Sequence, residues 1–237
     1  MKISSTDVQN NFGKYLALAL DGEDVIVTRN GKEAVKLIPY RDESMVFEST
    51  SPYDLKNRVS YEDFIALTES SDLRYELIDG EVFILASPSY RHQTAISEIF
   101  VSLYNWFKGK PCQPLTAPFD VTLVKQTDNI NVVQPDILVI CDKENIDVKG
   151  KYKGVPTLVV EVLSHSTRSK DMLKKLDLYM QTGIKEYWLV DPAKKEIFVY
   201  TFKDQDILDY TVYTDNKTVR SDVFEGFEIE LGSIFEV

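Results

Sequence analysis

Apolar residues come in short runs separated by polar turns over most of the chain from residue 59 onward. Five runs are rich in β-branched and aromatic residues, and this composition predicts strands. The runs are FDVTLV, VQPDILVIC, TLVVEVL, EYWLVD and EIFVYTF. Asp79-Gly80, inside RYELIDGEVFILA, predicts a further hairpin.

Apolar residues at helical spacing predict a short helix in YEDFIALTES, a second from about residue 90 to 108 and a third from 168 to 182. Repeated strands with helices between them predict a mixed sheet flanked by helices. This places residues 59–237 in the α/β or α+β class.

The first 40 residues follow a different pattern, with one helix and one hairpin. Thr6 and Gln9 fit a capping box at the start of the helix. Asn30-Gly31, between VIVT and AVKLI, indicates a tight turn between two strands. A segment of roughly 40 residues without cysteines or metal ligands seldom buries enough surface to fold alone. We therefore expect a small α+β domain over residues 1–40 that is completed by a second copy, as a homodimer.

Residues 41–58 mix charged residues, Ser, Thr and Pro without periodicity, and we interpret them as a linker. The 237 residues are 43% hydrophobic and 27% charged, as in a globular protein. We expect a cytoplasmic protein that is not in a membrane, because no apolar run approaches the ~20 residues of a membrane span and the N-terminus lacks a signal-peptide core. Cys112 and Cys141 have no CxxC spacing, so we expect neither a disulfide framework nor a zinc site.

The formal net charge of −11 argues at first against a nucleic-acid partner. The charge is unevenly distributed, however. Residues 196–237 hold ten acidic against three basic residues, whereas residues 143–175 hold eight basic against four acidic residues. A basic face, rather than the total charge, decides whether a phosphate backbone can bind. The basic segment includes Glu161, but it is also compatible with an ordinary solvated surface.

Glu161 lies in the middle of the apolar run TLVVEVL, which has the character of a strand buried on both faces. A buried carboxylate needs a cation, a cluster of donors or a proton. Asp136 lies in a second apolar run, directly after Pro135, so we expect it at a strand end or bulge. If the two strands are neighbours, both carboxylates could bind one divalent cation, for which oxygen ligands favour Mg²⁺ or Mn²⁺.

The helix predicted after Glu161 places Asp171, Lys175 and Tyr179 four residues apart, on one face. Lys175 on the inward side could reach a phosphate or a water molecule. The alternative is purely structural. In that case Glu161 and Lys175 form a buried ion pair, and Asp136 caps a turn.

Several of these segments occur in the order found in a known family. QPDILVI, VVEVLSHSTRSKD, KLDLY and GIKEYWLVDP resemble the Uma-two family, a restriction-endonuclease-like branch of the PD-(D/E)xK nuclease superfamily. The resemblance extends upstream to RYELIDGE and covers roughly residues 59–202. Leu163 stands where the superfamily usually has its lysine, and Lys175 matches the lysine that the family carries on the following helix.

The resemblance implies a restriction-endonuclease-like fold and metal-assisted hydrolysis of phosphodiester bonds. Asp136 and Glu161 would bind Mg²⁺ or Mn²⁺, and Lys175 would orient water or offset developing charge. Glu76 and His92 are further candidates for the same pocket, with a strand-edge charge and a helix N-terminal residue as the alternative interpretations.

Ser164 and Arg168 are candidate DNA contacts near the same site. Ser164 has a turn cap as its alternative role.

The segments STDVQNNFGKYLALAL and VIVTRNGKEAVKLIP resemble the Phd/YefM antitoxins, which are dimeric operator binders. Arg29 matches an arginine implicated in phosphate contact, whereas Gln9 replaces an arginine that often contacts DNA. The segment has five basic and five acidic residues, so dimerisation alone is the alternative to operator binding.

Two functional hypotheses follow. The first is a dimeric, divalent-metal-dependent endonuclease that acts on DNA. The second is a catalytically inactive nuclease fold that binds DNA or a toxin-like protein as part of a toxin-antitoxin type of regulation.

Overall fold

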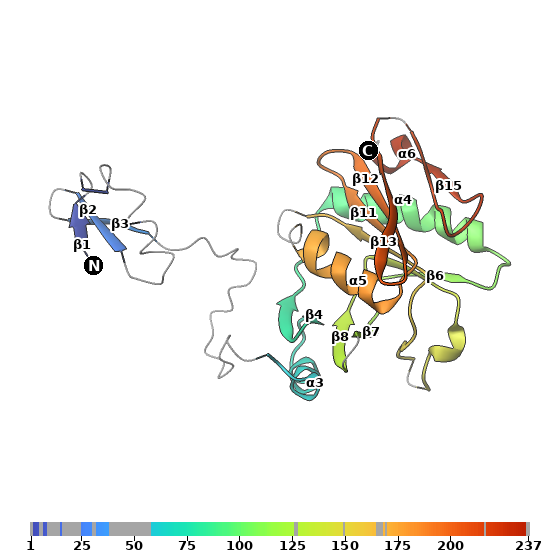
Figure 1. Cartoon of the computed structure of the whole chain (residues 1–237), viewed down its shortest axis with the longest axis horizontal. Helices are drawn as coiled ribbons and strands as arrows, with labels where there is room; N and C mark the ends of the chain where they lie inside the picture. Colours follow the sequence, from blue (N-terminus) through green and yellow to red (C-terminus); the bar gives the residue numbers. More distant parts are fainter. Residues whose placement is uncertain are drawn as a thin grey trace. The chain divides into compact units, whose positions relative to one another are not determined.

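The computed structural model describes residues 2–4, 7–8, 15, 25–29, 32–37, 58–125, 128–148, 150–164, 168, 170–215 and 217–235. The chain divides into two compact units, residues 1–48 and 49–237. Each unit is described by itself below (Figure 1).

The first unit contains a three-stranded sheet. Its strands are β1 (Lys2–Ser4), β2 (Val25–Arg29) and β3 (Lys32–Leu37), in the order β1-β2-β3. β2 and β3 are antiparallel, which confirms the predicted hairpin, whereas β1 pairs parallel to β2. The buried cluster of the described residues is small and consists of Ile3, Val8, Val25 and Val27, with Tyr15 packed against it.

Several expectations for the first unit fall outside the described residues. Of the helix that was expected to begin at Thr6, only Asp7, Val8 and Tyr15 are described, and all three are helical. Gln9 and the Asn30-Gly31 turn are not described. Neither are residues 41–57, which make up almost all of the expected linker.

The second unit is built around a mixed six-stranded sheet. Its strands are β6 (Gln113–Thr116), β9 (Ile137–Ile140), β10 (Leu158–Val162), β11 (Glu186–Asp191), β12 (Glu196–Lys203) and β13 (Asp206–Tyr213). The order is β13-β12-β11-β10-β9-β6. β10 and β11 are parallel, and the other neighbours are antiparallel. The prediction of a mixed sheet is therefore confirmed.

Two smaller sheets complete the strands of this unit. A four-stranded sheet has the order β5-β4-β8-β7, with β4 (Tyr75–Ile78), β5 (Glu81–Ile84), β7 (Val121–Lys125) and β8 (Asn129–Val133). β14 (Thr218–Arg220) pairs with β15 (Glu228–Glu230). Asp79 and Gly80 both have positive φ at the β4–β5 turn, as a primed two-residue hairpin requires.

Helices surround these sheets. They are α3 (Tyr61–Glu69), α4 (Tyr90–Phe107), the 3₁₀ helix η2 (Lys143–Asn145), the π-helix η3 (Lys170–Lys175), α5 (Leu176–Thr182) and α6 (Leu231–Phe235). The side chains of Ser60 and Ser89 cap the N-termini of α3 and α4. The prediction of one regular α-helix over 168–182 is wrong in its first part, because Lys170–Lys175 has π geometry.

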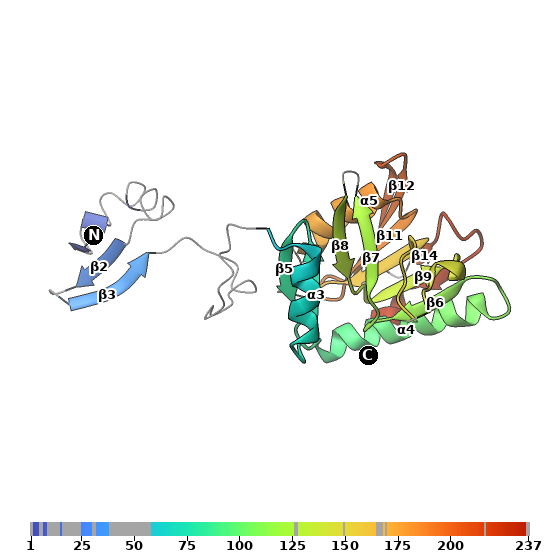
Figure 2. The same cartoon turned by 90° about the horizontal axis from the view of Figure 1, so that it is seen from below.

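The six-stranded sheet is buried on both faces. α4 covers one face with Ile99 and Leu103, opposite Val160 and other inward residues of the sheet (Figure 2). α5 and the four-stranded sheet pack on the other face, where Val159 is buried. Successive side chains of a strand point to opposite faces, so Glu161 is directed toward α5.

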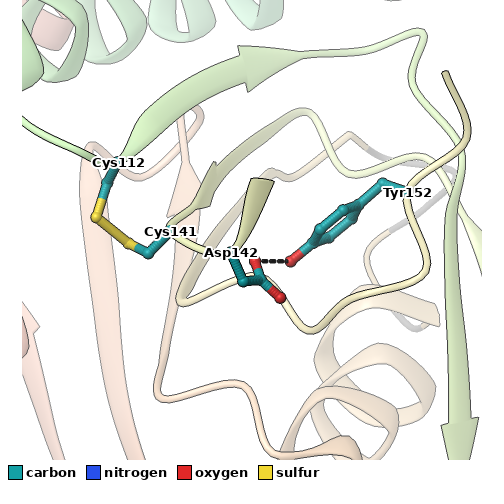
Figure 3. The surroundings of a disulfide bond; sticks show 4 residues. All are labelled: Cys112, Cys141, Asp142 and Tyr152. Atoms are coloured by element: carbon teal, nitrogen blue, oxygen red, sulfur yellow. Dashed lines mark hydrogen bonds between the residues drawn. A yellow bond between two sulfur atoms is a disulfide. The ribbon is translucent and has the colours of Figure 1, made fainter. Parts of the chain in front are cut away.

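Cys112 and Cys141 form a disulfide, contrary to the expectation from their spacing (Figure 3). Cys112 precedes β6 and Cys141 follows β9, and these antiparallel strands place Gln113 opposite Ile140. The two cysteines therefore face each other at the end of the strand pair. No sequence pattern indicated this pairing, because QPLT does not have the alternation typical of a strand. The bond lies beside Asp142, whose carboxylate accepts a hydrogen bond from Tyr152.

None of the helices in the described part of the chain is long and apolar enough to span a membrane.

Candidate functional site

A cavity of about 460 Å³ opens at the ends of the central strands in the second unit. Charged and titratable side chains from several segments line it: Arg74 before β4, Asp136 before β9, Glu161 in β10, His92 at the start of α4, and Lys170, Asp171 and Lys175 in η3. The structure thus brings together the three main residues predicted from the sequence, Asp136, Glu161 and Lys175.

The strand register explains why the two acids lie side by side. β9 and β10 are antiparallel neighbours, and Ile137 pairs with Val160, so the preceding Asp136 comes opposite Glu161. The Oδ2 atom of Asp136 accepts a hydrogen bond from the Val162 N–H at 2.8 Å, which fixes the orientation of the carboxylate. Asp136 lies just outside β9, as expected for a residue that follows a proline.

Glu161 is buried and bound by two donors. Its Oε1 atom accepts hydrogen bonds from Lys175 Nζ at 2.7 Å and from the Tyr179 hydroxyl at 2.6 Å. Burial raises the pKa of Glu161 to about 8; the Lys175 ammonium opposes this rise, and nearby carboxylates, first that of Asp171, add to it. Burial and the neighbouring carboxylates together thus raise the pKa of Glu161 more than the single ammonium of Lys175 lowers it.

Glu76, in β4, is the fully buried partner of two lysines. Its Oε2 lies 2.6 Å from Lys170 Nζ, its Oε1 lies 2.8 Å from Lys175 Nζ, and Oε1 also accepts the Gln134 N–H at 2.9 Å. Burial alone would raise the pKa of Glu76, but the two ammonium groups outweigh it and lower the pKa to about 2. The structure places Glu76 behind the cavity, and not at an exposed strand edge.

The π-helix η3 explains how two lysines five residues apart reach one carboxylate. In an α-helix, residues at i and i+5 differ by about 140° in direction. The π-helix is wound with an i to i+5 hydrogen-bond repeat, so Lys170 and Lys175 lie about one turn apart on the same side. Both side chains are buried and both contact Glu76.

The cluster has an excess of negative charge. It has the carboxylates of Glu76, Asp136, Glu161 and Asp171 against the ammonium groups of Lys170 and Lys175. With all four carboxylates ionised, these six groups have a formal charge of −2, which a divalent cation would offset. In the described residues, no three His, Cys, Asp or Glu side chains are grouped as ligands of one metal ion. A Mg²⁺ site does not need such a group, because Mg²⁺ typically uses one or two protein carboxylates together with water and phosphate.

His92 lies in the first turn of α4, with its Nε2 atom 3.4 Å from Asp136 Oδ2. Burial lowers the pKa of His92, but the hydrogen bond and the charge of Asp136 outweigh this and raise the pKa above its usual value. The Nδ1 atom is buried without a hydrogen-bond partner. His92 is thus a helix N-terminal residue that also lines the cavity, and a role in catalysis stays a prediction.

The candidate DNA contacts are placed differently from one another. Ser164 lines the cavity. Arg168 forms an ion pair with the buried carboxylate of Asp191, so its guanidinium is already engaged. Arg29 is the last residue of β2 in the first unit, and its side chain lies outside the described part.

Sequence reasoning missed Lys170 at this site. The spacing of four residues predicted that Asp171, Lys175 and Tyr179 share one face. Lys175 and Tyr179 donate hydrogen bonds to Glu161, and Asp171 pairs with Lys175. Lys170 does not fit that spacing and joins the site only through the π geometry. No periodicity of the sequence indicated that geometry.

Comparisons with known proteins agree with both resemblances found in the sequence. Residues 61–232 match the family model Uma2, described as "Putative restriction endonuclease". Residues 1–44 match the model for "Antitoxin Phd_YefM, type II toxin-antitoxin system". Both suspected domains are thereby confirmed.

One relative and one solved structure are also similar to this chain. An uncharacterized protein of Synechocystis is 28% identical over 149 residues, which are 62% of this chain and 76% of that protein. A crystal structure from Anabaena variabilis, described as "a putative nuclease belonging to DUF820", has a TM-score of 0.61 at 20% identity and covers 74% of this chain and 96% of its own. At that identity the second likeness shows the fold, which agrees with the restriction-endonuclease-like fold expected from the sequence.

Proposed function

The chain belongs to the Uma2 family, and from this premise we propose that it is a divalent-metal-dependent endonuclease that hydrolyses phosphodiester bonds of DNA. The observation that supports the proposal is the meeting of Asp136, Glu161 and Lys175 at one cavity. Two acids and a lysine in this arrangement suit a reaction in which negative charge develops on a phosphate group.

Asp136 and Glu161 would hold the cation, Mg²⁺ or Mn²⁺. The four carboxylates that meet two lysines in the cluster support a cation at this position. When bound, such an ion offsets charge on the phosphate oxygens and favours the ionisation of a water molecule at neutral pH.

Lys175 would act as a fixed positive charge. Burial lowers the pKa of Lys175, but the carboxylates of Glu161 and Glu76 outweigh burial and raise the pKa well above its usual value. The side chain therefore stays protonated near neutral pH and is unsuited to act as a base. Its roles would be to orient Glu161 and to stabilise the phosphate as a water oxygen bonds to phosphorus, one P–O ester bond breaks and the departing oxygen takes a proton.

The first unit would pair two protomers and could thereby bring two sites to the two strands of DNA. Its match to an antitoxin family also suggests operator DNA or a toxin-like protein as a partner.

One observation favours a second candidate function. The Oε1 atom of Glu161 is already bound to Lys175 and Tyr179, as in a self-contained structural ion pair. Together with the antitoxin-like first unit, this arrangement suits a catalytically inactive protein that binds DNA or a toxin-like protein, in a toxin-antitoxin type of regulation.

Cleavage of supercoiled plasmid separates the two candidates. The full chain is incubated with plasmid in EDTA, Mg²⁺ or Mn²⁺, beside the Glu161→Ala variant prepared identically. The nuclease proposal expects nicking that requires the metal and is lost in the variant. Binding without nicking under every metal condition would favour the regulatory alternative.

A further inference from the structure

One face of α4 carries a row of aromatic and polar side chains on the outside of the second unit. Tyr90, Ser97 and Tyr104 recur at intervals of seven residues, which is close to two helical turns, so they lie on one face. Gln93 and Phe100 lie on the same face between them. Figure 2 shows α4 running along the edge of the unit, outside the strands. We call these five residues the α4 row.

The middle of the α4 row is a wall of the cavity. Gln93, Ser97 and Phe100 all line the cavity that contains Asp136 and Glu161. Tyr90 and Tyr104 extend the row to either side, and their Cα atoms lie about 21 Å apart at the α-helical rise. The row therefore continues the site along the surface in both directions.

The two tyrosines of the row are exposed, and Phe100 is partly buried. Tyr90 is 72% exposed and Tyr104 is 50% exposed, although large aromatic side chains usually bury most of their surface. The rings of Phe100 and Tyr104 pack against each other with centroids 6.0 Å apart. This packing limits the motion of the Tyr104 ring, so its exposed surface is held in a defined orientation for stacking.

The charge around α4 differs from that of the whole chain. Residues 82–119 contain three basic residues, Arg91, Lys108 and Lys110, and one acidic residue, Glu98, which gives a local charge of +2. The whole chain has a formal charge of −11. Outside the acidic cluster of the cavity, residues 82–119 thus form a segment on which a polyanion meets less repulsion than on the chain as a whole.

We propose that the α4 row binds an unpaired DNA strand, with bases stacked on Tyr90 and Tyr104 and the intervening backbone directed into the cavity. The inference rests on the proposed nuclease function and defines the substrate as single-stranded DNA or an unpaired segment. Proteins that bind single strands combine positive charge along the backbone with aromatic side chains on which successive bases stack.

Two features favour an unpaired strand over a duplex. Stacking on a tyrosine needs a base with a free face, and in a duplex each base is covered by its neighbours. In addition, the acids that would act on the phosphate are recessed, since Glu161 is only 3% exposed. A cavity of about 460 Å³ is within the size range of pockets for small-molecule ligands, roughly 300–1,000 Å³, and so suits a piece of one strand.

The test measures binding without cleavage. Fluorescence anisotropy in EDTA records the affinity of the full chain for a labelled oligo(dT) strand and for a duplex of equal length. Tyr104→Ala should weaken single-strand binding by about 5- to 100-fold, as expected for the loss of one stacked base. Tyr210→Ala is the matched control, because Tyr210 is 60% exposed and packs on Tyr200 with centroids 5.9 Å apart, but lies in β13.

The outcomes separate this inference from the proposed function. Weaker single-strand binding in Tyr104→Ala, with unchanged binding in Tyr210→Ala, supports the α4 row even if the plasmid assay detects no nicking. Equal single-strand binding by both variants and wild type overturns the inference, and it leaves the nuclease proposal intact if plasmid is still nicked. Tighter binding of the duplex than of the single strand, unaffected by Tyr104→Ala, also overturns it.

Discussion

Among single residues, Glu76 joins both buried lysines of the site. Its carboxylate is fully buried, and it binds Lys170 and Lys175 through different oxygen atoms. Removing one partner from a buried ionic cluster leaves charges uncompensated, which costs more than breaking a surface pair.

Glu76→Gln is therefore expected to lower the free energy of unfolding of the second unit by about 3–5 kcal/mol. Glu81→Gln is the matched control, because Glu81 lies on the next strand and pairs with Lys174 of the same π-helix at the surface. The control should change stability by less than about 1 kcal/mol. Urea unfolding followed by tryptophan fluorescence reports this unit alone, since Trp106 and Trp188 both belong to it. Equal effects of the two variants would contradict the role given to Glu76.

The pKa of Glu76 also predicts how stability depends on pH. The folded pKa, about 2, lies below the ordinary value of 4.5, so the unfolded chain binds the proton more tightly. The stabilisation from Glu76 is present above about pH 4.5 and is lost as the pH falls toward 2. The urea midpoint of wild type should therefore fall more steeply below about pH 5 than that of Glu76→Gln. Parallel curves for the two proteins would show that Glu76 keeps an ordinary pKa.

The residues of the site differ in how far the sequence could reveal them. Asp136 and Glu161 were predictable because each places a charge inside an apolar run of the sequence. Glu186 is also a buried acid in a strand, but it accepts hydrogen bonds from Trp188, Ser221 and backbone N–H groups and is not among the described residues that line the cavity. Burial raises the pKa of Glu186 as well. Sequence pattern alone cannot separate a structural acid from one at a cavity.

At the scale of elements, long periodic segments were predicted and short or irregular ones were not. α4 and β10 have clear patterns and were expected at their observed places. β6, with the sequence QPLT, and the three-residue strands β14 and β15 have no periodicity and depend on pairing with distant segments. The disulfide was missed for the same reason, because it depends on the pairing of β6 with β9.

The disulfide between Cys112 and Cys141 should stabilise the second unit. It links residues separated by 29 positions. Closing a loop of that length lowers the conformational entropy of the unfolded chain and thereby raises the free energy of unfolding by about 3–4 kcal/mol. We expect reductant to lower the urea midpoint of wild type. The double variant Cys112→Ser/Cys141→Ser should have the lower midpoint with or without reductant. Two titratable thiols in the folded, unreduced protein would contradict the presence of the bond.

At the scale of the whole molecule, the two units differ in the size of their buried hydrophobic clusters. The second unit has two extensive clusters on the two faces of its main sheet. The first has a cluster of four buried side chains in its described residues. The sequence predicted this difference from segment length, because a segment of about 40 residues has little surface to bury.

This difference predicts that residues 1–40 make the protein a dimer. Light scattering coupled to size exclusion should give twice the chain mass of 27.2 kDa for the full chain at micromolar concentration. A fragment of residues 59–237 should be a folded monomer, since it retains both large clusters. A monomeric full chain, or a fragment that still dimerises, would show that the first unit does not pair the protomers.

The most direct test of the central claim compares two buried glutamates in adjacent strands. The rate of plasmid nicking in Mg²⁺ is measured for the full-length wild type, Glu161→Gln and Glu186→Gln, with folding checked by tryptophan fluorescence. We expect a loss of at least about 100-fold in Glu161→Gln, because this group would act at the reacting phosphate, and a rate within a few-fold of wild type in Glu186→Gln. Equal rates in the folded variants, or a wild type that cleaves neither the plasmid nor a single-stranded oligonucleotide, would contradict the claim that the cavity at Asp136 and Glu161 is a nuclease site.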